Sequence, residues 1–176
     1  MLESERSEER LAKEAQLLLG GGTASTARTI GFATVYILSD PKIRARLEQE
    51  LREPMAGWPD RVPTWAELER LPFLQALIKE SLRLSYAVMH RLPRVSPDVP
   101  VKFVDKKAEG GKGREWVIPP GTPVGMSIYL MHSDPEVYER PDEFVPERWV
   151  DGNVTPAMVR NYVPFCKGSR NCLGQK

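Results

Sequence analysis

The chain has 176 residues, of which 41% are hydrophobic and 28% are charged, a composition typical of one globular domain or of part of a larger one. Twenty-five Lys and Arg residues nearly balance 24 Asp and Glu residues, so the net charge is only +1. Such a balance provides no one-signed field to attract a phosphate backbone or an anionic membrane, which argues against nucleic acid as a partner.

Hydropathy and cysteine content bear on where the protein resides. The longest apolar stretches, 15–22 and 124–131, are far shorter than the roughly 20 residues that a helix needs to span a bilayer, so no membrane span is predicted in this chain. Cys166 and Cys172 are the only cysteines, too few for a disulfide framework, and they favour a reducing, intracellular compartment. A local disulfide between them is the alternative.

Residues 1–39 predict one long helix. Apolar residues recur at helical spacing from Leu11 to Ile37 behind an acidic first turn, and Asp40-Pro41 ends the pattern. Three glycines at 20–22 interrupt it, and each costs about 1 kcal/mol relative to Ala in a helix interior. Two interpretations are open: a linker between two shorter helices, or a place where a ligand approaches the backbone closely.

Residues 41–84 predict further helices with recognisable ends. Asp40 and Pro41 fit the N-cap and the first position of a helix. Thr64 and Glu67 have the spacing of a capping box. Pro72 separates the short helix after Thr64 from a second helix that runs through Leu84.

The pattern changes in region 85–133. Short β-type runs at 99–104 and 116–118 flank a tip rich in glycine and charge, which predicts a small hairpin or sheet. In region 134–176, Asp134-Pro135 predicts another short helix, and four later prolines favour loops. The predicted fold class is therefore mainly α with a small β region.

The C-terminal loop contains the strongest candidate for chemistry. Cys172 follows Lys167 and Arg170 and lies between Gly168 and Gly174. Nearby cations and helix-terminal N–H groups favour the thiolate, which is the form of cysteine that binds metals. On local sequence alone, a buried and inert cysteine is the alternative.

Phe165, Gly168, Arg170, Cys172 and Gly174 match the pattern F-x-x-G-x-R-x-C-x-G in full. This segment resembles the haem-binding loop of the cytochrome P-450 family. At ordinary residue frequencies, five fixed positions coincide by chance about once in a million windows or fewer. The resemblance implies that Cys172 is the axial ligand of haem iron. It also implies cofactor-binding roles for Phe165, Gly168 and Arg170, the last as a partner for a haem carboxylate.

Two further segments resemble structural motifs of the same family. Glu80 and Arg83 match E-x-x-R, and their spacing places both side chains on one helical face, although such a pair is most often solvated. Residues 146–149, Pro-Glu-Arg-Trp, resemble the family's P-E-R-W/F segment. The resemblance implies that Arg148 joins Glu80 and Arg83 in a buried triad beneath the haem, with a structural role.

The centre of the first helix resembles the family's A/G-G-x-D/E-T-T pattern, which lies over the oxygen-binding face of the haem. The resemblance implies that the Ser25 hydroxyl hydrogen-bonds dioxygen and helps to deliver protons, with Thr26 or ordered water as substitutes. Ser25 stands where the family usually has Thr, and Ala24 where it usually has an acid. The acid–alcohol pair is therefore incomplete.

Segment 90–95 resembles the strand where the family often places a cation against a haem propionate. Arg94 is the first choice for this role and Arg91 the second, because a guanidinium group binds a carboxylate in bidentate fashion. For Arg91, a substrate-side or surface position is the alternative. His90 and His132 lack metal-ligand spacing and are interpreted as ordinary structural residues.

The order of these motifs implies a C-terminal, incomplete part of the cytochrome P-450 fold, from the central distal helix to the haem-binding loop. The implied activity is that of a haem-thiolate monooxygenase with haem b. Such an enzyme takes electrons from an NADPH-dependent reductase and inserts one oxygen atom from O2 into a small organic substrate. The resemblance also implies a full-length parent at the endoplasmic-reticulum membrane, in the microsomal, secondary-metabolism branch.

Two alternatives remain. One is a truncated, catalytically inactive fragment that keeps the motifs but cannot retain haem. The other is a helical interaction module without a cofactor, in which the match of the Cys172 loop is a coincidence.

Overall fold

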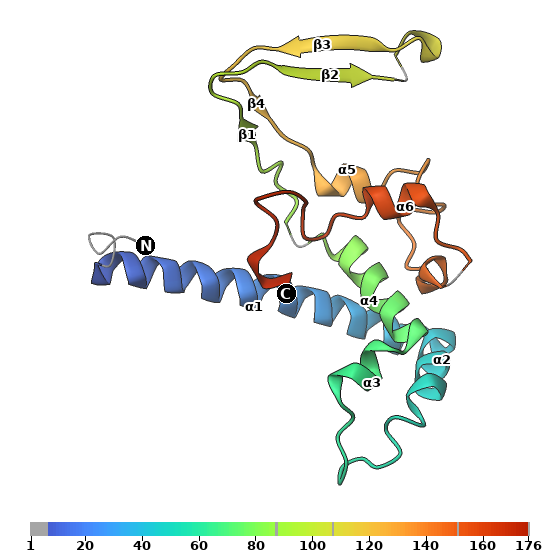
Figure 1. The fold of residues 1–176 in the computed structure, drawn as a ribbon. Helices are drawn as coiled ribbons and strands as arrows, with labels where there is room; N and C mark the ends of the chain where they lie inside the picture. Colours follow the sequence, from blue (N-terminus) through green and yellow to red (C-terminus); the bar gives the residue numbers. More distant parts are fainter. Residues whose placement is uncertain (1–6, 87, 107, 151, 176) are drawn as a thin grey trace.

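The computed structural model describes residues 7–86, 88–106, 108–150 and 152–175 (Figure 1). The first helix, α1 (Glu8–Ser39), is continuous over 32 residues, and its N-cap Ser7 accepts a hydrogen bond from the Arg10 amide. The three central glycines stay helical, so the interpretation of a linker between two shorter helices is wrong. The predicted start at residue 5 lies outside the described residues.

The next two helices begin at the predicted caps. In α2 (Pro41–Leu51), the Asp40 side chain accepts hydrogen bonds from the amides of residues 42 and 43. In α3 (Trp65–Glu69), Thr64 and Glu67 form both halves of a capping box. These ends are local, because each cap satisfies N–H groups two or three residues further along the chain.

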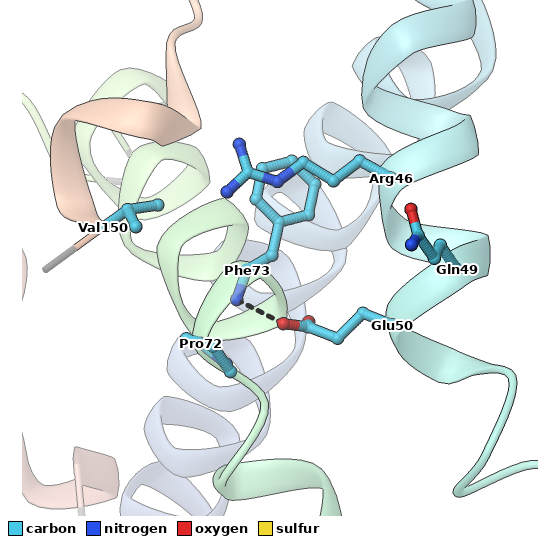
Figure 2. A pocket seen from close by; sticks show the side chains of 6 residues that line it. All are labelled: Arg46, Gln49, Glu50, Pro72, Phe73 and Val150. Atoms are coloured by element: carbon cyan, nitrogen blue, oxygen red, sulfur yellow. Dashed lines mark hydrogen bonds between the residues drawn. The ribbon is translucent and has the colours of Figure 1, made fainter.

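Helix α4 (Pro72–Ser85) is capped differently, by a side chain from another helix. The side chain of its N-cap residue, Leu71, makes no hydrogen bond to the start of the helix. The Glu50 carboxylate of α2 instead accepts from the amides of Phe73 and Leu74, both at 2.8 Å. Figure 2 shows Glu50 reaching the start of α4, with the guanidinium of Arg46 over the Phe73 ring at 4.1 Å from its centroid. Glu50 therefore fixes where α4 begins relative to α2.

Replacing Glu50 by Ala is expected to lower the free energy of unfolding by about 1–2 kcal/mol, because two amides at a helix start lose their acceptor and its charge. Urea unfolding followed by circular dichroism measures the change. Glu53→Ala removes a carboxylate from an exposed site three residues away and serves as the control. Equal effects of the two substitutions would contradict the role assigned to Glu50.

The β region consists of two antiparallel pairs. Strand β1 (Arg94–Val95) pairs with β4 (Pro123–Val124), and β2 (Val101–Asp105) pairs with β3 (Arg114–Ile118). In the second pair, Val101 lies opposite Ile118. The β2–β3 hairpin extends away from the helices (Figure 1), and its tip includes a short 3-10 helix, η2 (Ala108–Gly111). The prediction of a small hairpin in this region is confirmed.

The rest of the chain is short elements and loops. They are α5 (Ile128–His132), η3 (Pro146–Trp149), α6 (Pro156–Asn161) and η4 (Leu173–Gln175). The prediction of a helix at Asp134-Pro135 is wrong, because the segment forms only a turn. In this turn the Asp134 carbonyl accepts hydrogen bonds from the amides of Val137 and Tyr138. A cap and a proline suit the first turn of a helix, but they do not make the following residues continue it.

Helix α4 lies at the centre of the packing. Its residues Phe73 and Leu77 pack with Ile43 and Leu47 of α2. Another cluster joins residues of α4, η3 and α6 with the turn after α5: Ala76, Tyr138, Trp149 and Met158. Because both clusters include α4, this helix connects the N-terminal helices to the C-terminal segment. The observed fold is mainly α with a small β region, as predicted.

Candidate functional site

A buried carboxylate organises the centre of the structure. Glu80 of α4 is 0% exposed. Its two oxygens accept five hydrogen bonds, from Arg83 Nη2 (2.7 Å), Val145 N (3.0 Å) and Arg148 Nε (3.0 Å) at Oε1, and from Arg83 Nε (2.9 Å) and Trp149 Nε1 (2.7 Å) at Oε2. We refer to Glu80, Arg83, Arg148 and Trp149 as the Glu80 cluster.

The electrostatics of this cluster favour the ionised acid. Burial raises the pKa of the Glu80 carboxyl, but the hydrogen bond and charge of Arg83, the Val145 amide and the charge of Arg148 together lower that pKa below its usual range. Glu80 is therefore a carboxylate at neutral pH. The arrangement is costly to break, because removing one partner leaves a buried charge uncompensated.

The two guanidinium groups also hold the loop after α5. Arg83 Nη1 donates to the backbone carbonyls of His132 at 2.8 Å and Pro141 at 2.6 Å. Arg83 Nη2 donates to the backbone carbonyl of Glu143 at 3.1 Å. Arg148 donates to the carbonyls of residues 139 and 140 at 2.8 and 3.2 Å. All five N–H groups of Arg83 thus have acceptors. The cluster fixes the backbone of 139–145 as well as the side chains.

The Cys loop, residues 163–172, is closed by its own backbone. The amide of Cys166 donates to the Val163 carbonyl at 3.0 Å, and the amide of Cys172 donates to the Phe165 carbonyl at 2.9 Å. Gly168 has φ +87°, a left-handed conformation that L side chains rarely adopt, which gives a physical reason for glycine there. The Cys172 thiol is free and exposed, and Arg170 is also exposed.

A hollow of about 660 Å³ lies between the β1 region and the Cys loop. Its cationic lining residues are Arg91, Arg94, Arg160 and Lys167. Arg94 Nη1 donates to the carbonyls of Leu92 and Pro93, which turns its guanidinium back towards its own strand. Val163 and Cys166 also line the hollow. Cations and the Cys loop therefore border one space.

The first helix meets α4 at a hydroxyl pair. Thr29 Oγ1 lies 3.0 Å from Ser85 Oγ, and it donates to the Ser25 carbonyl at 3.0 Å, so Ser85 is the donor in the pair. One turn earlier, the Ser25 hydroxyl donates to the Gly21 carbonyl at 2.8 Å, and Thr26 is exposed. Within α1, all of which is described, no residue is buried. Its glycine-rich centre is open, because a Cβ at Gly21 would meet nothing within 4 Å.

Comparison with known families decides what kind of protein has these features. A profile of the family described as Cytochrome P-450 matches residues 2–176. The chain belongs to the cytochrome P-450 family. P-450 proteins are haem proteins with a cysteine thiolate ligand, so the cysteine pattern and the family membership agree.

Similar P-450 proteins come from fungi. The chain is 56% identical over 173 residues to "Cytochrome P-450 monooxygenase tndB" of Aspergillus flavipes, covering 98% of this chain and 33% of that protein. It is 56% identical over 172 residues to "Fusicoccadiene C-8 hydroxylase" of Phomopsis amygdali, covering 98% of this chain and 31% of that protein. The chain thus spans about a third of the length of these curated relatives.

A solved structure shows the same fold. A zebra fish cytochrome P-450 with Abiraterone superimposes with a TM-score of 0.72 at 26% identity, covering 96% of this chain and 36% of that chain. The fold is therefore an incomplete part of the P-450 fold, as predicted. Across the described residues, no helix combines the length and the apolar character that crossing a membrane requires.

The residues present in this P-450 chain fit haem. The donor set is a free, exposed thiol at Cys172 on a loop that its own backbone closes. The neighbouring hollow is lined by cations such as Arg94, which suit the carboxylates of a haem edge. At Gly21 of α1 an added Cβ would meet nothing within 4 Å, so a planar group can approach the helix backbone there.

Sequence reasoning placed Glu80, Arg83 and Arg148 together, and the structure brings them within hydrogen-bonding distance. Sequence reasoning gave no separate role to Trp149, whose indole nitrogen donates to Glu80. The position of Trp149 directly after Arg148 was the available signal. It also missed the two hydrogen bonds of His132, for which the local sequence contains no signal.

Proposed function

We propose that this chain is the thiolate-bearing part of a haem monooxygenase, with Cys172 as the axial ligand of haem b. The observation that carries the proposal is the free, exposed thiol of Cys172 in a loop whose backbone is closed at Phe165 and shaped at Gly168. Arg94 and Arg170 would bind the haem carboxylates as bidentate donors. When bound, haem with a thiolate ligand supplies the redox chemistry that cleaves the O–O bond.

The proposed reaction is hydroxylation of a small organic substrate. One O2, two electrons and two protons convert a C–H bond to C–OH and release one water. The electrons come from an NADPH-dependent reductase, and the intracellular parent protein is associated with the endoplasmic-reticulum membrane. Relatives named for hydroxylation of fusicoccadiene at C-8 support an apolar hydrocarbon as the substrate class.

Proton delivery would involve the hydroxyls of α1. The Ser25 hydroxyl donates to the Gly21 carbonyl, so its oxygen keeps lone pairs that accept a hydrogen bond from water. Thr26, the next residue along the helix, is exposed and supplies the second hydroxyl for this role. Glu80, Arg83 and Arg148 serve a structural purpose, because they bind one another and the backbone and none is free to touch a substrate.

The test is the absorption spectrum of the full chain supplied with haem, reduced and exposed to carbon monoxide. We expect a long-wavelength thiolate Soret band that Cys172→Ala abolishes. Cys166→Ala removes the other cysteine, six residues away, and should leave the band unchanged. A band that survives Cys172→Ala would contradict the ligand assignment.

The rival interpretation is that the chain keeps the motifs but retains no haem. The absence of buried residues in α1 favours this interpretation. Failure of the wild-type chain to bind haem would support this rival. Activity itself is tested by placing this chain in the matching segment of the Phomopsis amygdali relative and measuring fusicoccadiene hydroxylation. A chimera with the thiolate band but without a hydroxylated product would contradict the monooxygenase proposal.

A further inference from the structure

His132, the last residue of α5, is fully buried and makes a hydrogen bond through each ring nitrogen. Its Nε2 lies 3.0 Å from the amide nitrogen of Val163, and its Nδ1 lies 3.1 Å from the Arg83 carbonyl. An amide N–H can only donate, so Nε2 is the unprotonated acceptor. A carbonyl can only accept, so Nδ1 carries the hydrogen. The two backbone partners therefore specify one neutral tautomer.

These two bonds connect the Glu80 cluster to the Cys loop. Arg83 belongs to the cluster and to the last turn of α4. Val163 is the first residue of the Cys loop, and its carbonyl accepts from the Cys166 amide. The next carbonyl acceptor along the loop, Phe165, receives the amide of Cys172 itself. A single imidazole thus links α4 to the backbone that leads to the thiol.

The surroundings keep the ring in place and uncharged. Tyr162 stacks on it with ring centroids 5.7 Å apart, and Tyr138 meets it edge-on at 6.5 Å. Arg83 and Glu80 of α4 are the charged groups that face it, and burial, the largest effect, lowers the pKa of His132 to about 4. At neutral pH, the ring is therefore neutral and both hydrogen bonds persist.

We propose that His132 is a positioning residue for the Cys172 thiolate: it holds Val163 against the last turn of α4 and so sets where the Cys loop begins. The inference rests on the proposed haem-thiolate function, and it gives His132 a role without contact with haem or substrate. The acceptor at Nε2 carries that role, because this ring nitrogen accepts the hydrogen bond from the Val163 amide. The donor at Nδ1 attaches the ring to the Arg83 carbonyl of α4 and orients it.

Two substitutions distinguish the roles of the two ring nitrogens of His132. The side-chain carbonyl of Gln reaches about as far as Nε2, so His132→Gln keeps an acceptor for Val163, whereas His132→Asn ends near Nδ1 and loses it. In the reduced, carbon monoxide-treated haem complex, we expect His132→Asn to lower the ratio of thiolate to non-thiolate Soret bands about fivefold, the effect of one lost hydrogen bond. His132→Gln should stay near the wild-type ratio. Tyr162→Phe keeps the ring that stacks on His132 but removes the hydrogen bond from its hydroxyl to the Lys79 carbonyl of α4, so it measures the contribution of this second link.

Amide hydrogen exchange provides a readout without haem. We expect His132→Asn to speed exchange at Val163, Cys166 and Cys172, and His132→Gln to leave it unchanged. Equal behaviour of the Asn and Gln variants in both measurements would overturn the proposal and indicate that His132 only fills space. If the wild-type chain binds no haem, the proposed function fails, while exchange still tests the link from His132 to the loop.

The wild-type protein supplies a test that needs no variant to fold. The ¹⁵N spectrum of the His132 ring should show hydrogen on Nδ1 and a bare, hydrogen-bonded Nε2. The opposite tautomer would exclude Nε2 as the acceptor for Val163, and the proposal would be wrong.

Discussion

Replacing Glu80 by Gln is expected to lower the free energy of unfolding by about 3–5 kcal/mol, because it leaves two buried guanidinium groups without their counter-charge. The substitution keeps the shape of the side chain. It also turns one acceptor into an amide nitrogen, which faces donors of Arg83 and Arg148 at one oxygen position or of Arg83 and Trp149 at the other. Small domains have only about 5–15 kcal/mol of stability in total, so this loss is a large fraction of it.

Urea unfolding of the full chain, followed by circular dichroism, measures this loss. Glu48→Gln is the matched control, because Glu48 also pairs with an arginine, Arg44, at 2.7 Å, but both side chains are more than half exposed. An exposed pair of this kind contributes at most about 0.5 kcal/mol. A loss below about 1 kcal/mol for Glu80→Gln would show that the cluster is not the structural centre inferred from its burial.

Acidification is expected to destabilise the protein through His132 before most carboxylates titrate. Burial lowers the pKa of His132 from 6.5 to about 4, so the unfolded state takes up a proton at a higher pH than the folded state does. The stability that the neutral ring contributes is present above pH 6.5 and is lost as pH falls towards 4. The loss is about 2 kcal/mol between pH 7 and 5 and about 3 kcal/mol by pH 4.

The measurement is urea unfolding at pH 7 and pH 5 for the wild type and for His132→Gln, which cannot titrate at this position. Glu80 contributes little in this window, because the pKa of its carboxyl is lowered in the folded state and its contribution to stability is lost only as the pH falls below the usual carboxyl value of 4.5. The wild type should therefore lose about 2 kcal/mol more than the variant. Parallel pH dependence in the two proteins would rule out His132 as the source.

Local features were predictable from the sequence because the residues that define each of them lie close together along the chain. The caps at Asp40 and Thr64 satisfy amides two or three residues away, and both were found as expected. The E-x-x-R spacing of Glu80 and Arg83 puts them on one helical face, and the cysteine pattern around Cys172 specified the family. The hairpin in region 85–133 followed from its own β-type runs and glycine-rich tip.

Only the tertiary structure decided how these features are used. Local sequence favours a solvated pair for Glu80 and Arg83, and burial became favourable only when Arg148, 68 residues from Glu80, and Trp149 brought further donors to the same carboxylate. The continuity of α1 through its glycines was likewise undecided locally. The role of His132 depends on partners 49 and 31 residues away. Hydrogen bonds between distant segments have no sequence period. The sequence by itself therefore determined the capped starts of α2 and α3, the hairpin and the thiol, whereas folding determined which charges are buried and which backbone segments are tied together around the Cys loop.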